Sequence, residues 1–271
     1  MKIAVAIAPE NALASAFVVF RGIEESIKKA AVLGYDGIEL ALMNKEQTDI
    51  NRVKSLIKEY NLEIPVVSTG QVFAGLNLWF TNPDINIRNK TVEIFKGLIE
   101  LASEFGAMVN MGRVRGPIHA GETIDVAEKR FIEVMEQLSD YGSKYGVELI
   151  LEPVNRYEIN FVNSVDEGAD LLNKLNRNNV KLMPDVFHMN IEDQSIVGTF
   201  IKHFNRIAYI HFADSNRLAP GQGHLHFPDI ISALNSLGYK GWVSVEILPE
   251  PDPDTAAKQS IEYLRTLIPR K

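Results

Sequence analysis

The chain has 271 residues, of which 46% are hydrophobic and 23% charged, an ordinary composition for a globular protein with a sizeable core. Its formal charge of −7 argues against nucleic acid as a partner, because proteins that bind phosphate backbones carry clustered Lys and Arg. No apolar run approaches the ~18 residues of a membrane helix. Cysteine is absent, which excludes disulfides and thiolate metal sites, and we expect a cytoplasmic protein.

The first half of the chain predicts four units, each an apolar strand followed by an amphipathic helix. After the first strand, Ile23, Ile27 and Ala30 recur at helical spacing, and Gly34 ends the pattern. A long loop is expected from Gly70 through Pro83, before the third helix. The expected strands are residues 3–8, 37–42, 64–68 and 107–111, and the expected helices are residues 21–33, 48–60, 85–105 and 123–145.

The second half repeats this alternation. Eight strands in strict alternation with helices imply parallel pairing with right-handed crossovers, and continuously apolar strands indicate a sheet buried on both faces. Since a (β/α)₈ barrel needs about 250 residues, we predict a single TIM barrel of the α/β class over residues 1–271. The last four strands are expected at residues 147–151, 180–184, 207–210 and 242–245, with helices beginning at Val165, Ser195, Phe227 and Pro253.

Each of these last four strands runs into a side chain that can bind a metal. The four residues are 26 to 35 apart, about one strand-plus-helix unit, so their side chains should meet at the C-terminal rim of the barrel. A single strand-end acid more often caps a helix or pairs with Arg, but four in succession favour a metal site. One His with three carboxylates suits Mn²⁺, Mg²⁺ or Co²⁺ better than a structural zinc. The candidate ligands are Glu152, Asp185, His211 and Glu246.

Further polar residues follow the candidate ligands in the same loops. Glu158 comes six residues after Glu152, His188 three after Asp185, and Arg217 six after His211. A lone histidine such as His188 is as often an ordinary half-buried residue as a functional one. Beside a metal, His188 and Arg217 are better interpreted as donors to a polarised substrate oxygen.

Three segments in this half resemble the signatures of the ketose 3-epimerases, the D-tagatose/D-psicose 3-epimerase group of the xylose-isomerase-like TIM-barrel superfamily. They are LEPVNRYE at 151–158, DVFHMNIE at 185–192 and HFADSNR at 211–217. In the first half, STGQ at 68–71 and GRVRG at 112–116 resemble more closely a sub-branch that contains 5-keto-L-gluconate epimerases.

The resemblance implies a role for each candidate residue. Glu152, Asp185, His211 and Glu246 would hold one divalent ion, most simply Mn²⁺, which polarises the ketose carbonyl and favours a cis-enediolate. Glu152 and Glu246 would exchange a proton on opposite faces of the sugar. The residues expected to bind and orient the substrate are Glu158, His188, Arg217 and Gln71.

Two arginines that follow the fourth strand suggest an acidic substrate. The guanidinium of arginine commonly forms paired hydrogen bonds with a carboxylate or phosphate. Arg113 or Arg115 could therefore bind a substrate carboxylate, and Arg115 is the candidate that we name. A surface ion pair is an equally good interpretation of either residue.

Several alternatives remain open from the sequence. A hydroxypyruvate isomerase-like or inosose dehydratase-like enzyme would use the same fold and a related metal site. A DNA-repair endonuclease of the endonuclease-IV type would need more than the six histidines present and a basic face, and a non-catalytic sugar-binding protein would not need the complete ligand set. A homo-oligomer is also open, and the apolar segment 71–82 could cover either the sugar or a partner subunit.

Overall fold

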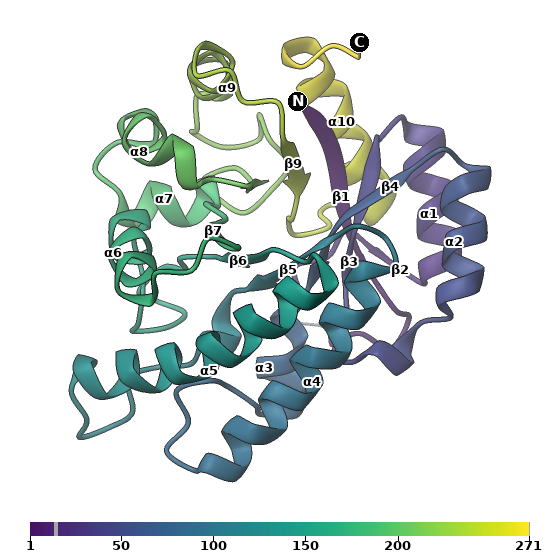
Figure 1. Ribbon diagram of the computed structural model, residues 1–271. Coiled ribbons are helices and arrows are strands. Elements are labelled where there is room, and N and C mark those ends of the chain that lie inside the picture. The colour runs from purple at the N-terminus through teal and green to yellow at the C-terminus, as the bar shows by residue number, and fades with distance from the viewer. Residues whose placement is uncertain (14–15, 271) are drawn as a thin grey trace.

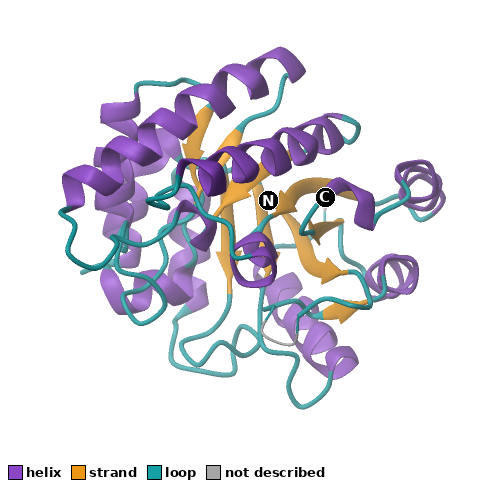
Figure 2. Ribbon diagram, turned by 90° about the horizontal axis from the view of Figure 1, so that it is seen from below, coloured by secondary structure: helices purple, strands orange, loops and turns teal. Residues whose placement is uncertain are grey.

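Parallel strands form a barrel with helices around its outside (Figures 1 and 2), so the predicted TIM barrel is confirmed. The computed structural model describes residues 1–13 and 16–270. Within these residues, no helix has both the length and the apolar character needed to cross a membrane. The strands are β1 Lys2–Ala8, β2 Phe20–Arg21, β3 Gly37–Ala41, β4 Glu63–Ser68, β5 Met108–Met111, β6 Leu149–Leu151, β7 Val180–Leu182, β8 Tyr209–Phe212 and β9 Trp242–Val245.

The barrel closes beside two of the predicted metal ligands. The hydrogen-bonded strand order is β7-β6-β5-β4-β3-β1-β9-β8, and β2 is an additional short strand that pairs with β1. Single parallel bridges between Leu182 and Ile207 and between Asp185 and His211 join the two ends of this order. The backbone that completes the barrel therefore also holds Asp185 and His211 next to each other.

The predicted helices are present, and each predicted bound lies within two residues of the observed one. Capping explains several starts: Ser164, Ser195 and Asp252 each accept a hydrogen bond from a backbone N–H of the first turn of the following helix. In the part of the chain that the structure describes, three short 3₁₀ helices cover Lys45–Gln47, Arg113–Arg115 and Phe204–Arg206. The α-helices are α1 Ile23–Leu33, α2 Ile50–Glu59, α3 Gly70–Leu76, α4 Ile85–Ser103, α5 Ile124–Tyr145, α6 Val165–Leu175, α7 Val186–Glu192, α8 Ile196–His203, α9 Phe227–Ser236 and α10 Pro253–Leu267.

Two short α-helices, α3 and α7, were not expected, and both lie at the C-terminal rim of the barrel. The segment predicted as a long loop from Gly70 contains α3. Helix α7 begins directly after Asp185, whose side chain accepts a hydrogen bond from the N–H of Phe187 at 2.9 Å. Each of these helices has seven residues, too few for a helical period to stand out in the sequence.

The side chains of β1 alternate between two environments. Ile3, Val5 and Ile7 belong to the large apolar core that includes the surrounding helices, whereas Ala6 and Ala8 belong to a separate small cluster. Because successive side chains of a strand point to opposite faces, the alanines of β1 face the barrel interior. Strand β1 thus leaves space near the barrel axis for longer side chains from other strands.

Outside the barrel, an aromatic cluster joins α4 and α5 to the loops at the rim. Phe131 of α5 lies 6.3 Å from Phe80 and 6.2 Å from Phe161, measured between ring centroids, and Phe80 lies 4.8 Å from Phe95 of α4. All four side chains are buried. This cluster ties the two long helices to the segments on either side of the site.

We expect Phe131→Ala to lower the free energy of unfolding by about 3–5 kcal/mol, because it removes a fully buried ring and leaves a cavity. Urea denaturation measures the change. The control is Val126→Ala on the same helix, where the side chain is exposed and truncation should have little effect. A loss for Phe131→Ala no larger than that of the control would contradict the packing role of the cluster.

Candidate metal centre and active site

The structure brings the four predicted ligands together. Each offers one ligand atom, and these four atoms all lie within 4.8 Å of one another. Glu152 follows β6, His211 lies inside β8, and Glu246 follows β9, so three of the four positions come directly from strand ends. Asp185 comes three residues after β7 and begins α7. The cluster is buried, with Glu246 the most accessible member.

The two ring nitrogens of His211 have different partners. Its Nε2 lies 2.9 Å from the nearer carboxylate oxygen of Glu39. Its Nδ1 faces the other ligands, at 3.3 Å from Glu152 Oε1, 3.4 Å from Glu246 Oε2 and 3.9 Å from Asp185 Oδ2. Within the described residues, this buried Nδ1 makes no hydrogen bond.

A divalent cation fits this arrangement. It would give Nδ1 a partner and would balance three carboxylates that otherwise face one another at close range. The electrostatics point the same way, because Glu39 and Glu246 raise the pKa of His211 well above its usual range although burial opposes them. The negative field that favours a proton on this imidazole would also favour a metal ion. The four residues can therefore hold one divalent cation.

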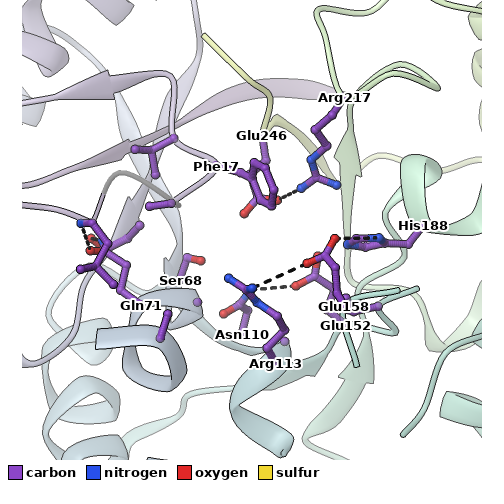
Figure 3. A pocket seen from close by; sticks show the side chains of 18 residues that line it. Phe17, Ser68, Gln71, Asn110, Arg113, Glu152, Glu158, His188, Arg217 and Glu246 are labelled. Carbon is purple, nitrogen blue, oxygen red and sulfur yellow. Dashed lines mark hydrogen bonds and ion pairs between the residues drawn. The ribbon is translucent and has the colours of Figure 1, made fainter. Parts of the chain in front are cut away.

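The two glutamates of the cluster have different environments. Burial raises the pKa of Glu152 to about 7, against the opposing effect of His211. Burial also acts to raise the pKa of Glu246, but His211 and Arg217 outweigh it and bring the pKa down to about 2. In Figure 3, Glu152 and Glu246 enter the cavity from different sides.

Arg217 is held rigidly beside the cluster. Its guanidinium donates hydrogen bonds to Asp185 Oδ2, at 2.6 Å, and to Glu246 Oε2. The rings of Phe17 and Phe187 lie 4.7 and 4.8 Å from its central carbon, close enough for cation–π attraction to both. The backbone of Arg217 has a φ of 63°, a left-handed conformation that its turn imposes. A side chain fixed in this way can orient a substrate oxygen without much loss of entropy.

A cavity next to the ligands is lined by four of the five residues predicted to bind substrate (Figure 3). Glu158, His188, Arg217 and Gln71 all line it, together with Asn110 and Arg113. The space between the lining residues, including the open mouth, is about 590 Å³.

Asn155 connects two of the lining residues. Its side-chain amide nitrogen donates to His188 Nδ1, at 2.8 Å, and to Glu158 Oε1, at 3.1 Å. Burial lowers the pKa of His188 well below its usual range, so the imidazole is neutral. Because Nδ1 accepts from Asn155, the ring proton of His188 lies on Nε2, from where it can be donated to a ligand in the cavity.

The prediction that Arg115 reaches the substrate is wrong. Arg115 is fully buried, and its guanidinium donates to the backbone oxygens of Phe161, Val162, Gly112 and Glu152 at 2.7–2.9 Å. The 3₁₀ turn after β5 directs this side chain under the loop that follows β6. The guanidinium has five N–H donors, so it can satisfy several backbone carbonyl oxygens there.

Arg113, the other arginine of this segment, lines the cavity instead. Its Nη1 lies 3.8 Å from Glu158 Oε2, a distance that leaves the guanidinium donors largely uncommitted. Gln71 also lines the cavity, but both ends of its amide are engaged: Nε2 donates to the oxygen of Ala41 at 3.2 Å and Oε1 accepts from the N–H of Leu13 at 3.3 Å. Gln71 therefore holds two rim segments together.

Sequence reasoning missed Glu39, Asn155 and Phe17. Glu39 carried a signal that could have found it, since it is an acid within an otherwise apolar strand buried on both faces. Asn155 and Phe17 carried no comparable signal, because loop residues of these types are common and their partners are distant in sequence.

Comparisons with known proteins agree with this geometry. A family model described as "Xylose isomerase-like TIM barrel" matches residues 27–267. The chain is 30% identical over 227 residues to an L-ribulose 3-epimerase of Methylomonas sp. (strain DH-1), a match that covers 83% of this chain and 78% of that protein. It is also 30% identical over 227 residues to a D-psicose 3-epimerase of Ruminiclostridium cellulolyticum, with 81% and 76% covered.

Among solved structures, the fold is similar to a 3-keto-D-glucoside 4-epimerase from E. coli. The TM-score is 0.83, the identity is 22%, and 98% of this chain and 99% of that chain are covered. The curated relatives are sugar epimerases, so the predicted enzyme class, an isomerase, and the predicted superfamily are confirmed. The chain belongs to the xylose isomerase-like TIM barrel family.

Proposed function

We propose that this protein is a divalent-metal-dependent sugar epimerase that acts on a ketose or a keto-sugar acid through a cis-enediolate. The observation that carries the proposal is the buried cluster of Glu152, Asp185, His211 and Glu246 at the wall of a cavity. The curated relatives support an epimerase more than a carbonyl-shifting isomerase or a dehydratase, which would use a similar site.

The protein's own residues would perform the proton transfers. A bound cation would polarise the substrate carbonyl and so make the adjacent C–H more acidic. One of Glu152 and Glu246 removes that proton, and the other returns a proton to the opposite face of the same carbon, which inverts its configuration. The two glutamates enter the cavity from different sides, which suits removal of the proton on one face and its return on the other.

The neighbouring side chains would orient the sugar. His188 would donate a hydrogen bond from Nε2 to a substrate oxygen. The guanidinium of Arg217, which lies beside Glu246, would also donate to a substrate oxygen. Glu158, fixed by Asn155, would accept from a hydroxyl. Placement matters because the reacting carbon must lie between two carboxylates, where an error of about an ångström is costly.

We further propose Mn²⁺ as the metal, with Co²⁺ or Mg²⁺ as alternatives, because the donors are three hard carboxylates and one imidazole. A cytoplasmic location without a nucleic-acid partner stays the prediction from composition. An acidic substrate, such as 5-keto-L-gluconate, is favoured by the guanidinium of Arg113 in the cavity.

We expect Mn²⁺ to stabilise the protein. Ligands that bind the folded state alone raise the free energy of unfolding by about 2.7 kcal/mol at a free concentration of one hundred times Kd. Thermal unfolding with and without Mn²⁺ measures the effect. Asp185→Asn keeps the size of the side chain and its helix-capping oxygen, so it should fold but lose most of the Mn²⁺-dependent increase. An equal increase in the variant and the native protein would contradict the assignment of this ligand.

The reaction itself is tested by proton exchange at carbon. In D₂O, the Mn²⁺-loaded protein should introduce deuterium next to the carbonyl of its substrate and form the epimer, as followed by NMR on a panel of neutral ketohexoses and ketohexonates. Glu246→Gln and Glu152→Gln should each lower the rate by at least ~10²-fold. Glu63→Gln, at an exposed position at the start of β4, is the control that should keep the rate. Isomerised product without an epimer would favour a carbonyl-shifting isomerase instead.

For the acid specificity, we expect Arg113→Leu to lower kcat/KM for the preferred keto-sugar acid by about 10- to 100-fold, because a hydrogen bond to a charged group contributes about 1.5–3 kcal/mol. The kcat/KM for neutral ketohexoses should change much less. Arg177→Leu, which removes an arginine that pairs with Asp140 outside the cavity, is the matched control. Equal losses on acid and neutral sugars would show that Arg113 supports the site without selecting for charge.

A further inference from the structure

We infer that Glu39 is a positioning residue of the metal centre, which orients His211 through Nε2 so that Nδ1 faces the cation. This inference deepens the proposed function and rests on its metal site. It concerns a residue of β3, three strands away from the strand of His211, that is not itself one of the four ligands.

The contact is short and entirely buried. Both carboxylate oxygens of Glu39 approach His211 Nε2, at 2.9 and 3.2 Å, and both side chains have no exposed surface. Within the described residues, no Lys or Arg forms an ion pair with Glu39. A fully buried carboxylate whose single charged partner is an imidazole is costly, and a hydrophobic side chain would pack there at lower cost. The position of Glu39 is therefore explained better by its contact with His211 than by stability.

The barrel is shaped to allow this contact. Glu39 is on β3 and His211 is on β8, and in the sheet β1 and β9 lie between these two strands. Ala6 of β1 pairs directly with Glu39, and Ser244 of β9 pairs directly with His211. Because the intervening strands present small side chains at these levels, the two long side chains can meet across the interior.

The surroundings of Glu39 are polar in an otherwise apolar interior. The hydroxyls of Tyr209 and Ser244 are buried, and in the described residues neither makes a hydrogen bond. The negative charge of Glu39 acts on the Tyr209 phenol, so this hydroxyl lies close to the carboxylate.

The chemistry of imidazole connects this contact to the metal. A neutral imidazole has one N–H, and an acceptor at Nε2 fixes that proton there and leaves the Nδ1 lone pair for a cation. A carboxylate behind a ligand histidine also makes the ligating nitrogen more basic. The unpaired Nδ1 of His211 already points at the other three ligands.

The first test compares Mn²⁺ affinity in Glu39→Gln and in the native chain, measured by titration calorimetry and by the loss of the free Mn²⁺ EPR signal. Glutamine keeps the size and one acceptor oxygen but removes the charge. We expect the Kd for Mn²⁺ to rise about 10- to 100-fold, with circular dichroism showing that the fold is kept. Glu63→Gln removes an exposed glutamate from the neighbouring strand β4 and should leave the Kd unchanged. A folded Glu39→Gln protein with the native Kd would overturn the inference.

A second measurement needs no variant and so holds even if Glu39→Gln fails to fold. In ¹⁵N-labelled native protein loaded with diamagnetic Zn²⁺, His211 should show a proton on Nε2 and a metal-shifted Nδ1. An unprotonated Nε2 would overturn the role of Glu39. If the native chain binds neither metal, the metal site of the proposed function fails as well, whereas tight binding with an insensitive Glu39→Gln variant removes the positioning role alone.

Discussion

Negative charge concentrated around one buried imidazole is the constraint on which the site depends. Three ligand carboxylates face Nδ1 of His211, and Glu39 faces Nε2. Like charges at these distances repel strongly in a protein interior, where screening by water is weak. Arg217 offsets part of the repulsion through Asp185 and Glu246. The remaining excess of negative charge explains why the cluster is suited to a cation rather than to holding the fold together.

The barrel can hold this unfavourable cluster because its backbone places the ligands independently of their charge. Strand pairing positions His211 and the segments that end at Glu152 and Glu246, and the bridge between Asp185 and His211 completes the barrel. The free energy needed to bring the carboxylates together is supplied by the large apolar core between strands and helices. Stability and chemistry therefore come from opposite faces of the same strands, as the alternation along β1 illustrates.

How far the sequence predicts this site depends on the range of the contacts. The strand-helix units repeat along the chain, and the four candidate ligands lie at a similar position in the last four units, so periodicity was sufficient to predict that they come together. Arg113 and Arg115 are two residues apart, and which of them enters the cavity is decided by a 3₁₀ turn that no periodic pattern encodes. The pairing of Glu39 with His211 joins residues 172 apart across the barrel and appears only in three dimensions. Helix α7 was missed because it is short and begins at a ligand.

The site divides into two parts of different structural origin, and this division bears on substrate choice. The ligands and Glu39 are tied to strands, whose positions the barrel determines. Arg113 and Glu158, which pair at the other side of the cavity, lie in the segments after β5 and β6. Loops at this face of a TIM barrel change without disturbing the barrel itself. Under the proposed function, the candidate metal centre can therefore stay constant while loop residues select the sugar, which is consistent with relatives of about 30% identity whose names specify different ketoses.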